Sequence, residues 1–209
     1  FTKNWSSEVV AILQSLRDKS FWETKDSEGE ILWGDARQQL HHLPQAFKVD
    51  LILLDAFSPS HCPELWSKEF LTALSKKLLP GGRMITYCSA AAVRASLKEA
   101  GLKLYSLLPL NQQCKEWSIG TMASQQVESP ILNYSGRATT WRCLSQMEEE
   151  HLLTRAAVPY RDPNGIDDAA SILKRRRKEQ TDCNMERTSS WRKRWGVGKK
   201  RGYRLISTD

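Results

Sequence analysis

The sequence predicts an α/β fold built on a doubly wound sheet. Apolar runs of strand length alternate with stretches in which apolar residues recur at helical spacing, and Gly or Pro residues separate them. One apolar strand, Asp50 to Leu54, is expected to be parallel and buried. It ends abruptly in Asp55 and is followed by the turn-forming pair Ser58-Pro59. Carboxyl ends of strands in an open α/β sheet are where ligands bind. Asp55 is therefore the first candidate for a functional residue.

The elements around this strand alternate regularly. The helix after Asp55 is expected to stop at Pro80-Gly81-Gly82, and the helix after that at Gly101. Such alternation implies parallel strands joined by helical crossovers. In chain order, the pattern predicts a strand at 50–54, a helix at 63–79, a strand at 83–88, a helix at 90–100 and a strand at 102–108.

Upstream of these elements, residues 1–20 are expected to form a helix and residues 31–33 a short strand that ends in Gly34-Asp35-Ala36. Two acidic strand ends on one edge of a sheet suit a ligand that presents both a hydrogen-bond donor and a cation. Each acid has a structural alternative. Asp35 is also a good helix N-cap, and Asp55 is also a turn initiator before Ser-Pro.

These residues resemble the class I S-adenosylmethionine-dependent methyltransferases, whose fold is Rossmann-like, and within them the MnmC-like tRNA wobble-uridine methyltransferases. The resemblance covers residues 30–125 best, and the later segment His151 to Pro163 is similar to bacterial members. The matching segments are Leu54-Asp55-Ala56-Phe57-Ser58-Pro59, Pro63-Glu64-Leu65-Trp66, Pro80-Gly81-Gly82, Thr86-Tyr87-Cys88-Ser89-Ala90, Val93-Arg94, Leu97 and Ala100-Gly101.

The resemblance implies methyl transfer from S-adenosyl-L-methionine to the aminomethyl nitrogen of 5-aminomethyl-2-thiouridine in a tRNA anticodon. The amine needs a free lone pair, so a proton acceptor is required near neutral pH. Asp55 is the expected catalytic residue, as the carboxylate that accepts a hydrogen bond from the amine, orients it or takes its proton. Asp35 is expected to accept a hydrogen bond from the adenine amino group, with a backbone contact from Ala36.

Substrate contacts are expected from Phe57 and Pro59, which follow Asp55, and from Lys115-Glu116, which fall where the family carries a charged cluster. A solvated lysine on an edge strand is the alternative for Lys115. Three further residues are candidates to line the substrate crevice: Tyr87, Ser89 and Arg94. The alternative for Tyr87 and Ser89 is a role in packing and capping at the strand end.

One element of the family pattern is not visible. Class I methyltransferases bind the methionine moiety through a glycine-rich loop after their first strand, and nothing before Gly34 resembles one. Because the sequence also begins with Phe1, it is expected to be the latter part of a longer protein, with a partial methyltransferase domain at 1–145 and a helical linker and basic extension at 146–209. Residues 147–157 are expected to form a helix whose Glu148-Glu149-Glu150 face is solvated, and residues 158–165 a turn or extended linker.

Charge is distributed unevenly along the 209 residues, whose net charge is +7. Residues 174–204 carry 13 Lys and Arg against 3 acids, which leaves a net of −3 for the remainder. Cations neutralise phosphates and the interleaved Trp191 and Trp195 suit stacking on bases, so tRNA is the expected partner. A solvated tail is the alternative. The cations expected to bind RNA are Arg175, Arg176, Arg192 and Arg194.

The remaining composition bounds other functions. Five cysteines without a Cys-x-x-Cys pair favour a reducing cytoplasm, and His and Cys lack zinc-ligand spacing, so no metal is expected. No apolar run approaches the ~20 residues that span a membrane. The oxidase domain fused to some family members is not seen, so an upstream oxidase is expected to be a separate protein. A noncatalytic RNA-binding module and, less favoured, a spermidine-synthase-like aminopropyltransferase are the alternative functions.

Overall fold

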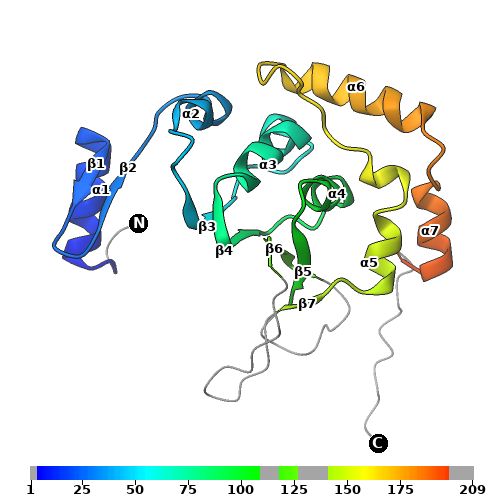
Figure 1. The fold of residues 1–209 in the computed structure, drawn as a ribbon, viewed down its shortest axis with the longest axis horizontal. Coiled ribbons are helices and arrows are strands. Elements are labelled where there is room, and N and C mark those ends of the chain that lie inside the picture. The colour runs from blue at the N-terminus through cyan, green and yellow to red at the C-terminus, as the bar shows by residue number, and fades with distance from the viewer. Residues whose placement is uncertain (1–3, 109–117, 127–140, 198–209) are drawn as a thin grey trace, which may run out of the picture. The chain divides into compact units, whose positions relative to one another are not determined.

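The computed structural model describes residues 4–108, 118–126 and 141–197. The chain divides into two compact units, residues 1–44 and 45–209, each with its own sheet (Figure 1). The predicted boundary after residue 145 falls within the second unit.

The first unit consists of α1 (Ser7–Lys19), β1 (Phe21–Glu23), β2 (Glu28–Glu30) and α2 (Ala36–His42). The Ser6 hydroxyl caps α1 by accepting from the Val9 amide at 3.3 Å. Ser20 ends this helix in a left-handed conformation, with φ of 60°. The predicted helix at 1–20 is therefore confirmed over the described residues.

The strand predicted at 31–33 is wrong, because the strand in this region is β2, which ends at Glu30 and pairs antiparallel with β1. The turn between them is closed by Thr24, whose amide donates to the Ser27 carbonyl at 2.7 Å. Gly29 lies opposite Trp22, and a Cβ there would come within 1.7 Å of the indole ring. The hairpin of β1 and β2 thus needs a glycine at position 29, opposite Trp22. Because the Thr24–Ser27 turn sets the pairing of the two strands, β2 ends at Glu30 and does not include residues 31–33.

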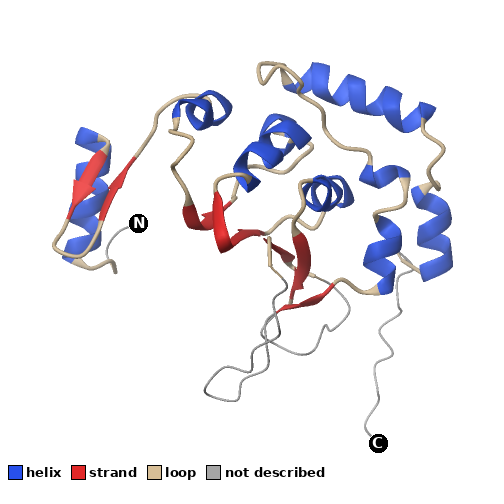
Figure 2. Ribbon diagram, in the orientation of Figure 1, coloured by secondary structure: helices blue, strands red, loops and turns tan. Residues whose placement is uncertain are grey.

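The sheet of the second unit has the order β3-β4-β6-β5-β7. β3 and β4 are parallel, and β6 is antiparallel to both β4 and β5, so β3, β4 and β5 run in one direction. The α/β fold class is confirmed, since helices and strands both build the chain (Figure 2). The sheet is mixed, however, because β6 inserts between β4 and β5. The strands are β3 (Val49–Leu53), β4 (Leu78–Thr86), β5 (Lys103–Leu107), β6 (Gly120–Ser124) and β7 (Trp141–Cys143).

β3 was expected to be buried, and this is wrong. Among the described strands it pairs with β4 alone, and Leu51 and Leu53 are 50% and 69% exposed. β4 begins earlier than predicted and includes Pro80-Gly81-Gly82. A Cβ on Gly82 would approach the Val49 carbonyl at 3.0 Å, so glycine permits the close approach of the two strands here.

Two helical segments replace the single helix predicted at 63–79: the short 3₁₀ helix η1 (Pro63–Trp66) and α3 (Lys68–Ser75). The break falls at Ser67, whose hydroxyl caps α3 by accepting from the Phe70 amide at 3.2 Å. The helix predicted at 90–100 is confirmed as α4 (Ala91–Glu99), which packs beside α3 (Figure 1). The core between helices and sheet contains the fully buried side chains of Leu71, Met84, Val93, Leu97 and Ala123.

The C-terminal part of the second unit contains α5 (Gln146–His151), η2 (Arg155–Ala157), α6 (Ala169–Asp182) and α7 (Thr188–Trp195). The segment between η2 and α6, predicted as a turn or extended linker, packs on the start of α3. There the Lys68 amide donates to the Tyr160 carbonyl at 2.8 Å, and Glu69 binds the Arg161 guanidinium at 2.6 Å. Residues 146–197 are thus folded onto the sheet domain.

Candidate active site

The candidate site begins where β3 ends. The last hydrogen bond between this strand and β4 is made by the Leu54 amide, which donates to the Ile85 carbonyl at 2.9 Å. Asp55 follows immediately and its side chain is exposed. Within the described ranges no group donates a hydrogen bond to its carboxylate. At the carboxyl end of a strand there is therefore a carboxylate that accepts no hydrogen bond from the described residues. A ligand amine or hydroxyl can bind there.

Two aromatic side chains hold the backbone directly after Asp55. The Tyr87 hydroxyl donates to the Ala56 carbonyl at 2.5 Å, and the Trp66 Nε1 donates to the Phe57 carbonyl at 2.6 Å. The two rings meet edge to face, with centroids 6.1 Å apart. Trp66 is fully buried. The turn that carries Asp55 is thus fixed from a rigid base, although the side chains of Asp55 and Phe57 are exposed.

The state of the Tyr87 hydroxyl favours this role. Desolvation, followed by the nearby Cys88 and Asp55 charges, raises the pKa of Tyr87 above its usual value. Like an ordinary tyrosine, whose pKa is ~10, it is protonated at neutral pH and can donate to Ala56. The sequence suggested Tyr87 either as a crevice-lining residue or as a packing residue at the strand end. The signal for this role was the pair of Trp66 and Tyr87, whose polar hydrogens need acceptors when the rings pack against the protein.

The turn continues through Ser58, whose hydroxyl lies 2.8 Å from His61 Nδ1. The His61 amide donates to the Ser58 carbonyl at 2.9 Å, which closes the turn. Phe57 projects from it and is 81% exposed, while Pro59 is half-buried. The predicted substrate contacts of Phe57 and Pro59 remain predictions, and the exposure of Phe57 leaves its ring available for them.

Asp35 is the N-cap of α2 in the first unit. Its carboxylate accepts from the Arg37 amide at 2.9 Å and pairs with the Arg37 guanidinium at 2.7 Å. The hydrogen bond from this guanidinium is the main reason why the pKa of Asp35 lies below its usual value. The capping alternative is thus realised. The carboxylate is still 40% exposed, and Ala36 is exposed as the first helical residue, so both can contact a ligand.

Lys115 and Glu116 lie outside the described residues, and their substrate contacts remain predictions. Arg94 was expected to line the crevice, and this is wrong because its side chain is only 4% exposed. Its Nη1 donates to Glu148 at 2.9 Å, and its Nε donates to Thr121 at 2.8 Å.

Glu148 was expected on a solvated face of α5 and is instead buried. Burial by itself would raise its pKa, but hydrogen bonds from Ser106, Ser145, Arg94 and Arg142 outweigh burial and lower the pKa to about 2. The pair Ser145 and Glu148 forms a capping box, a pattern that is visible in the sequence and could have placed Glu148 correctly.

Three of the four arginines expected to bind RNA are engaged within the chain. Arg175 pairs with Asp167 at 2.7 Å, Arg176 donates to the Val158 carbonyl at 2.7 Å, and Arg194 pairs with Glu186 at 2.6 Å. Arg192 is exposed and has no ion pair within the described ranges. Their contacts with RNA remain predictions.

The two tryptophans of the basic segment differ in exposure. Trp191 is buried and stacks on His151, with centroids 4.0 Å apart, so its ring is not accessible to bases. Trp195 is 37% exposed and donates to Glu150 at 2.8 Å.

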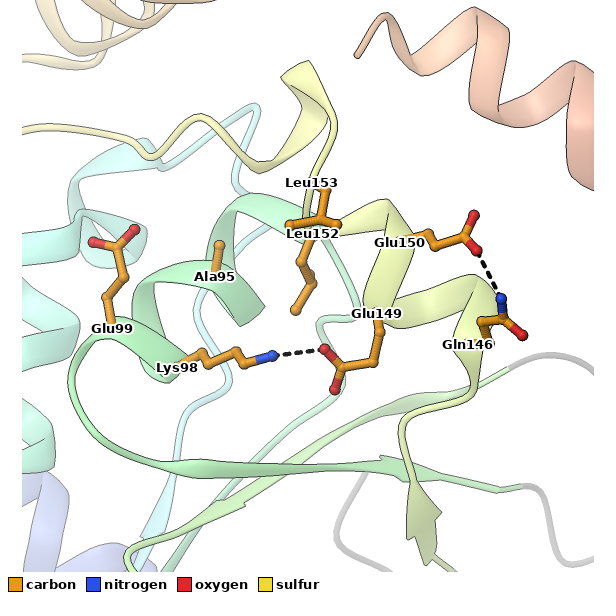
Figure 3. A pocket seen from close by; sticks show the side chains of 8 residues that line it. All are labelled: Ala95, Lys98, Glu99, Gln146, Glu149, Glu150, Leu152 and Leu153. Atoms are coloured by element: carbon orange, nitrogen blue, oxygen red, sulfur yellow. Dashed lines mark hydrogen bonds and ion pairs between the residues drawn. The ribbon is translucent and has the colours of Figure 1, made fainter. Parts of the chain in front are cut away.

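A pocket of about 480 Å³ lies between α4 and α5, and Glu150, which binds Arg194 and Trp195, is one of its lining residues (Figure 3). Its charged groups are already paired: Lys98 donates to Glu149 at 2.6 Å, and Gln146 donates to Glu150 at 3.0 Å. None of the predicted site residues lines it. Its floor is formed by Ala95, Leu152 and Leu153.

In the part of the chain that the structure describes, no three His, Cys, Asp or Glu side chains gather in a way that could hold a metal ion. A search of the same residues finds no helix with the length and apolarity to cross a bilayer.

The fold and the strand-end carboxylate define a class of protein. A family model described as S-adenosyl-L-methionine-dependent methyltransferase matches residues 2–113, which include both Asp35 and Asp55, and the chain belongs to this family. S-adenosyl-L-methionine is the cofactor of the family. Among solved structures, the chain is similar to MnmC2 from Aquifex aeolicus, with 26% sequence identity and a TM-score of 0.68.

The match to MnmC2 covers 84% of this chain and 52% of that one, so the chain spans about half the length of its structural relative. The MnmC-like resemblance noted from the sequence is thereby confirmed.

The contacts of Asp35 and Ala36 with the adenine end of S-adenosyl-L-methionine remain predictions. Asp35 keeps an exposed share of its carboxylate beside the exposed helix start at Ala36. Gly34 precedes it with φ of +119°, a conformation that favours glycine and leaves the turn without a side chain. These residues would hold the adenine end of S-adenosyl-L-methionine.

Proposed function

We propose that this chain is part of a tRNA methyltransferase that methylates the aminomethyl nitrogen of 5-aminomethyl-2-thiouridine at the wobble position. The observation that carries the proposal is the exposed carboxylate of Asp55, which accepts no hydrogen bond from the described residues and stands on a turn fixed by Tyr87 and Trp66. Membership of the methyltransferase family and the likeness to MnmC2 support it.

The role of Asp55 follows from the chemistry of the substrate. S-adenosyl-L-methionine supplies an electrophilic methyl group, so the protein must supply an oriented amine with a free lone pair. An alkylammonium has a pKa of ~10.4, and its lone pair is free only after a proton is lost. Asp55 accepts the hydrogen bond of the amine, orients it and provides a place for the proton.

The turn beneath Asp55 adds positioning. Hydrogen bonds to two consecutive carbonyls, those of Ala56 and Phe57, restrict the backbone on which the carboxylate stands. A displacement of ~1 Å at a reacting group can cost about a hundredfold in rate, so such restraint is of direct catalytic value. Phe57 offers an exposed aromatic face to the base that carries the amine.

The experiment compares the longest available form of the protein with its Asp55→Asn variant, using labelled S-adenosyl-L-methionine and tRNA that carries 5-aminomethyl-2-thiouridine. Asp50→Asn is the matched control, because Asp50 is an exposed acid on the same strand. Label in the 5-methylaminomethyl nucleoside should fall by about 10²-fold or more in Asp55→Asn and stay unchanged in Asp50→Asn. Absence of transfer by the unmodified protein, with tRNA still bound, would favour the noncatalytic RNA-binding module.

A further inference from the structure

The helix α6 separates its cations into two groups. Arg175 and Arg176 point toward the protein: Arg175 pairs with Asp167, and Arg176 donates to the carbonyls of Val158 and Ala156 at 2.7 and 2.9 Å. The Arg176 guanidinium also lies over the Tyr160 ring, 4.4 Å from its centroid. These two arginines hold the helix against the η2–α6 segment and are already satisfied.

The opposite face of α6 carries the second group, Lys174, Arg177 and Lys178, which we call the basic face. All three are exposed, and none forms an ion pair within the described ranges. Their spacing of three and four residues places them together on one side of a helix. Like charges at this spacing repel one another by a few tenths of a kcal/mol per pair. The basic face therefore destabilises the helix unless an anion binds to it.

The geometry points to this basic face as a binding surface for the phosphate backbone of RNA, with Arg175 and Arg176 acting as its structural support. The proposal rests on the tRNA substrate of the proposed function. It assigns RNA contact to residues other than the arginines that the basic composition first suggested.

The surroundings of the basic face favour RNA over a membrane. A helix that binds a bilayer surface presents large apolar side chains beside its cations. Here the other exposed positions on α6 carry small, polar or acidic side chains: Ala170, Ser171, Thr181 and Asp182. The large apolar residues of the helix, Ile172 and Leu173, are turned inward, buried and half-buried. A hydrophilic polyanion matches such a surface.

The helix is also held in place, which makes phosphate contact efficient. Asp168 caps it by accepting from the Ser171 amide at 2.7 Å, and Gln180 near the other end donates to the Arg155 carbonyl at 2.9 Å. A fixed row of cations loses less conformational freedom on binding than a disordered tail.

The test measures binding rather than methyl transfer. The dissociation constant of the full chain for a fluorescently labelled tRNA transcript is determined over a range of KCl concentrations, for the unmodified protein and for the triple variant Lys174→Gln/Arg177→Gln/Lys178→Gln. We expect binding to weaken by roughly tenfold to a hundredfold. The slope of log K against log salt should fall by about 0.7–0.9 for each phosphate that the variant no longer neutralises.

A matched control removes the same charge elsewhere. Lys25, Lys76 and Lys103 are exposed and form no ion pair within the described ranges, so Lys25→Gln/Lys76→Gln/Lys103→Gln should keep both affinity and salt slope within about twofold. Equal losses in the two triple variants would overturn the proposal, because net charge alone would then explain them. An unchanged salt slope in the α6 variant would overturn it as well.

Two further measurements separate the remaining outcomes. Arg176→Gln should lower the melting temperature, whereas the α6 triple variant should melt like the unmodified protein. Binding to vesicles that contain phosphatidylserine, lost in the triple variant while tRNA binding persists, would assign the basic face to a membrane instead. If the unmodified protein binds tRNA but transfers no methyl group, the proposed function is refuted and the basic face is still an RNA-binding surface.

Discussion

The guanidinium of Arg94 on α4 and the carboxylate of Glu148 on α5 form an ion pair with an Nη1–Oε1 distance of 2.9 Å in the interior of the second unit. The remaining groups are satisfied by neighbours: Arg94 also donates to Ser118 at 2.9 Å, and Glu148 accepts from Arg142 at 2.7 Å. A buried pair with complete partners fixes how helices and sheet fit together, and breaking one side of it is costly.

Replacing Glu148 by Gln should therefore lower the free energy of unfolding by about 3–5 kcal/mol, because the Arg94 charge stays buried without its partner. Urea denaturation measures this directly. Glu149→Gln serves as the control, since Glu149 is 46% exposed and pairs with the 55% exposed Lys98. Its loss should cost about 0–1 kcal/mol. If both variants lost a similar amount of unfolding free energy, the buried Arg94–Glu148 pair would contribute no more to stability than the exposed Lys98–Glu149 pair.

The same carboxylate predicts a pH dependence of stability. The pKa of Glu148 is lowered from 4.5 to about 2 in the folded protein. The contribution of Glu148 to the free energy of unfolding is fully present above pH ~4.5, which is the pKa in the unfolded chain. It disappears as the pH falls toward 2, because the unfolded chain then binds the proton more readily than the folded protein does. Unfolding measured between pH 5 and pH 2 should show a loss on the order of 3 kcal/mol that is missing from Glu148→Gln. Parallel curves for the two proteins would contradict the assignment.

Tyr87→Phe should loosen the turn that carries Asp55, since it removes the hydroxyl that donates to Ala56. Hydrogen exchange of amides 55–58 should become faster, and the kcat of the proposed transfer should fall by about tenfold, equivalent to one hydrogen bond of ~1.4 kcal/mol. The Kd for tRNA should not change. Tyr160→Phe is the control, because it removes a hydroxyl while keeping the ring beneath Arg176. Unaltered exchange in Tyr87→Phe would exclude the positioning role.

Gly120 provides a further test where β6 begins next to the same tyrosine. A Cβ at this position would lie 2.3 Å from the Thr86 carbonyl and 3.0 Å from the Tyr87 Cα. Gly120→Ala must therefore shift the β4–β6 ladder, and we expect a loss of about 1–3 kcal/mol together with reduced activity. Gln125→Ala, an exposed position just past β6, should have little effect on the melting temperature.

The sequence predicted the elements whose signals are local. The helix α4 and the strands β3 and β5 follow from apolar periodicity and from punctuation by Pro and Gly, and the confirmed family resemblance depends on the short segment around Asp55. The sequence did not predict features that depend on pairing between residues far apart in the chain. Arg94 and Glu148 are 54 positions apart, so neither residue indicates by itself that it is buried.

The basic segment failed in the same way. Arg175, Arg176 and Arg177 are adjacent and chemically alike, yet their positions around α6 direct the first two inward and the third to solvent. Composition reports how many cations a segment has. It does not report which of them already have partners, because the acceptors lie in η2 and in the segment after it.

The bridge between Ser67 and Tyr160, where the C-terminal segment joins the start of α3, has a consequence for how mutations in this region will manifest themselves in a cell. A truncation after residue 145 would remove Glu148, the ionic partner of Arg94, and Arg161, the partner of Glu69, and yield a chain prone to degradation rather than a trimmed protein. Within the intact chain, Arg176 variants should reduce the amount of protein, and Arg177 variants should reduce its affinity. A genetic screen that scores growth alone would place both in one class, and quantifying protein abundance alongside growth would separate them.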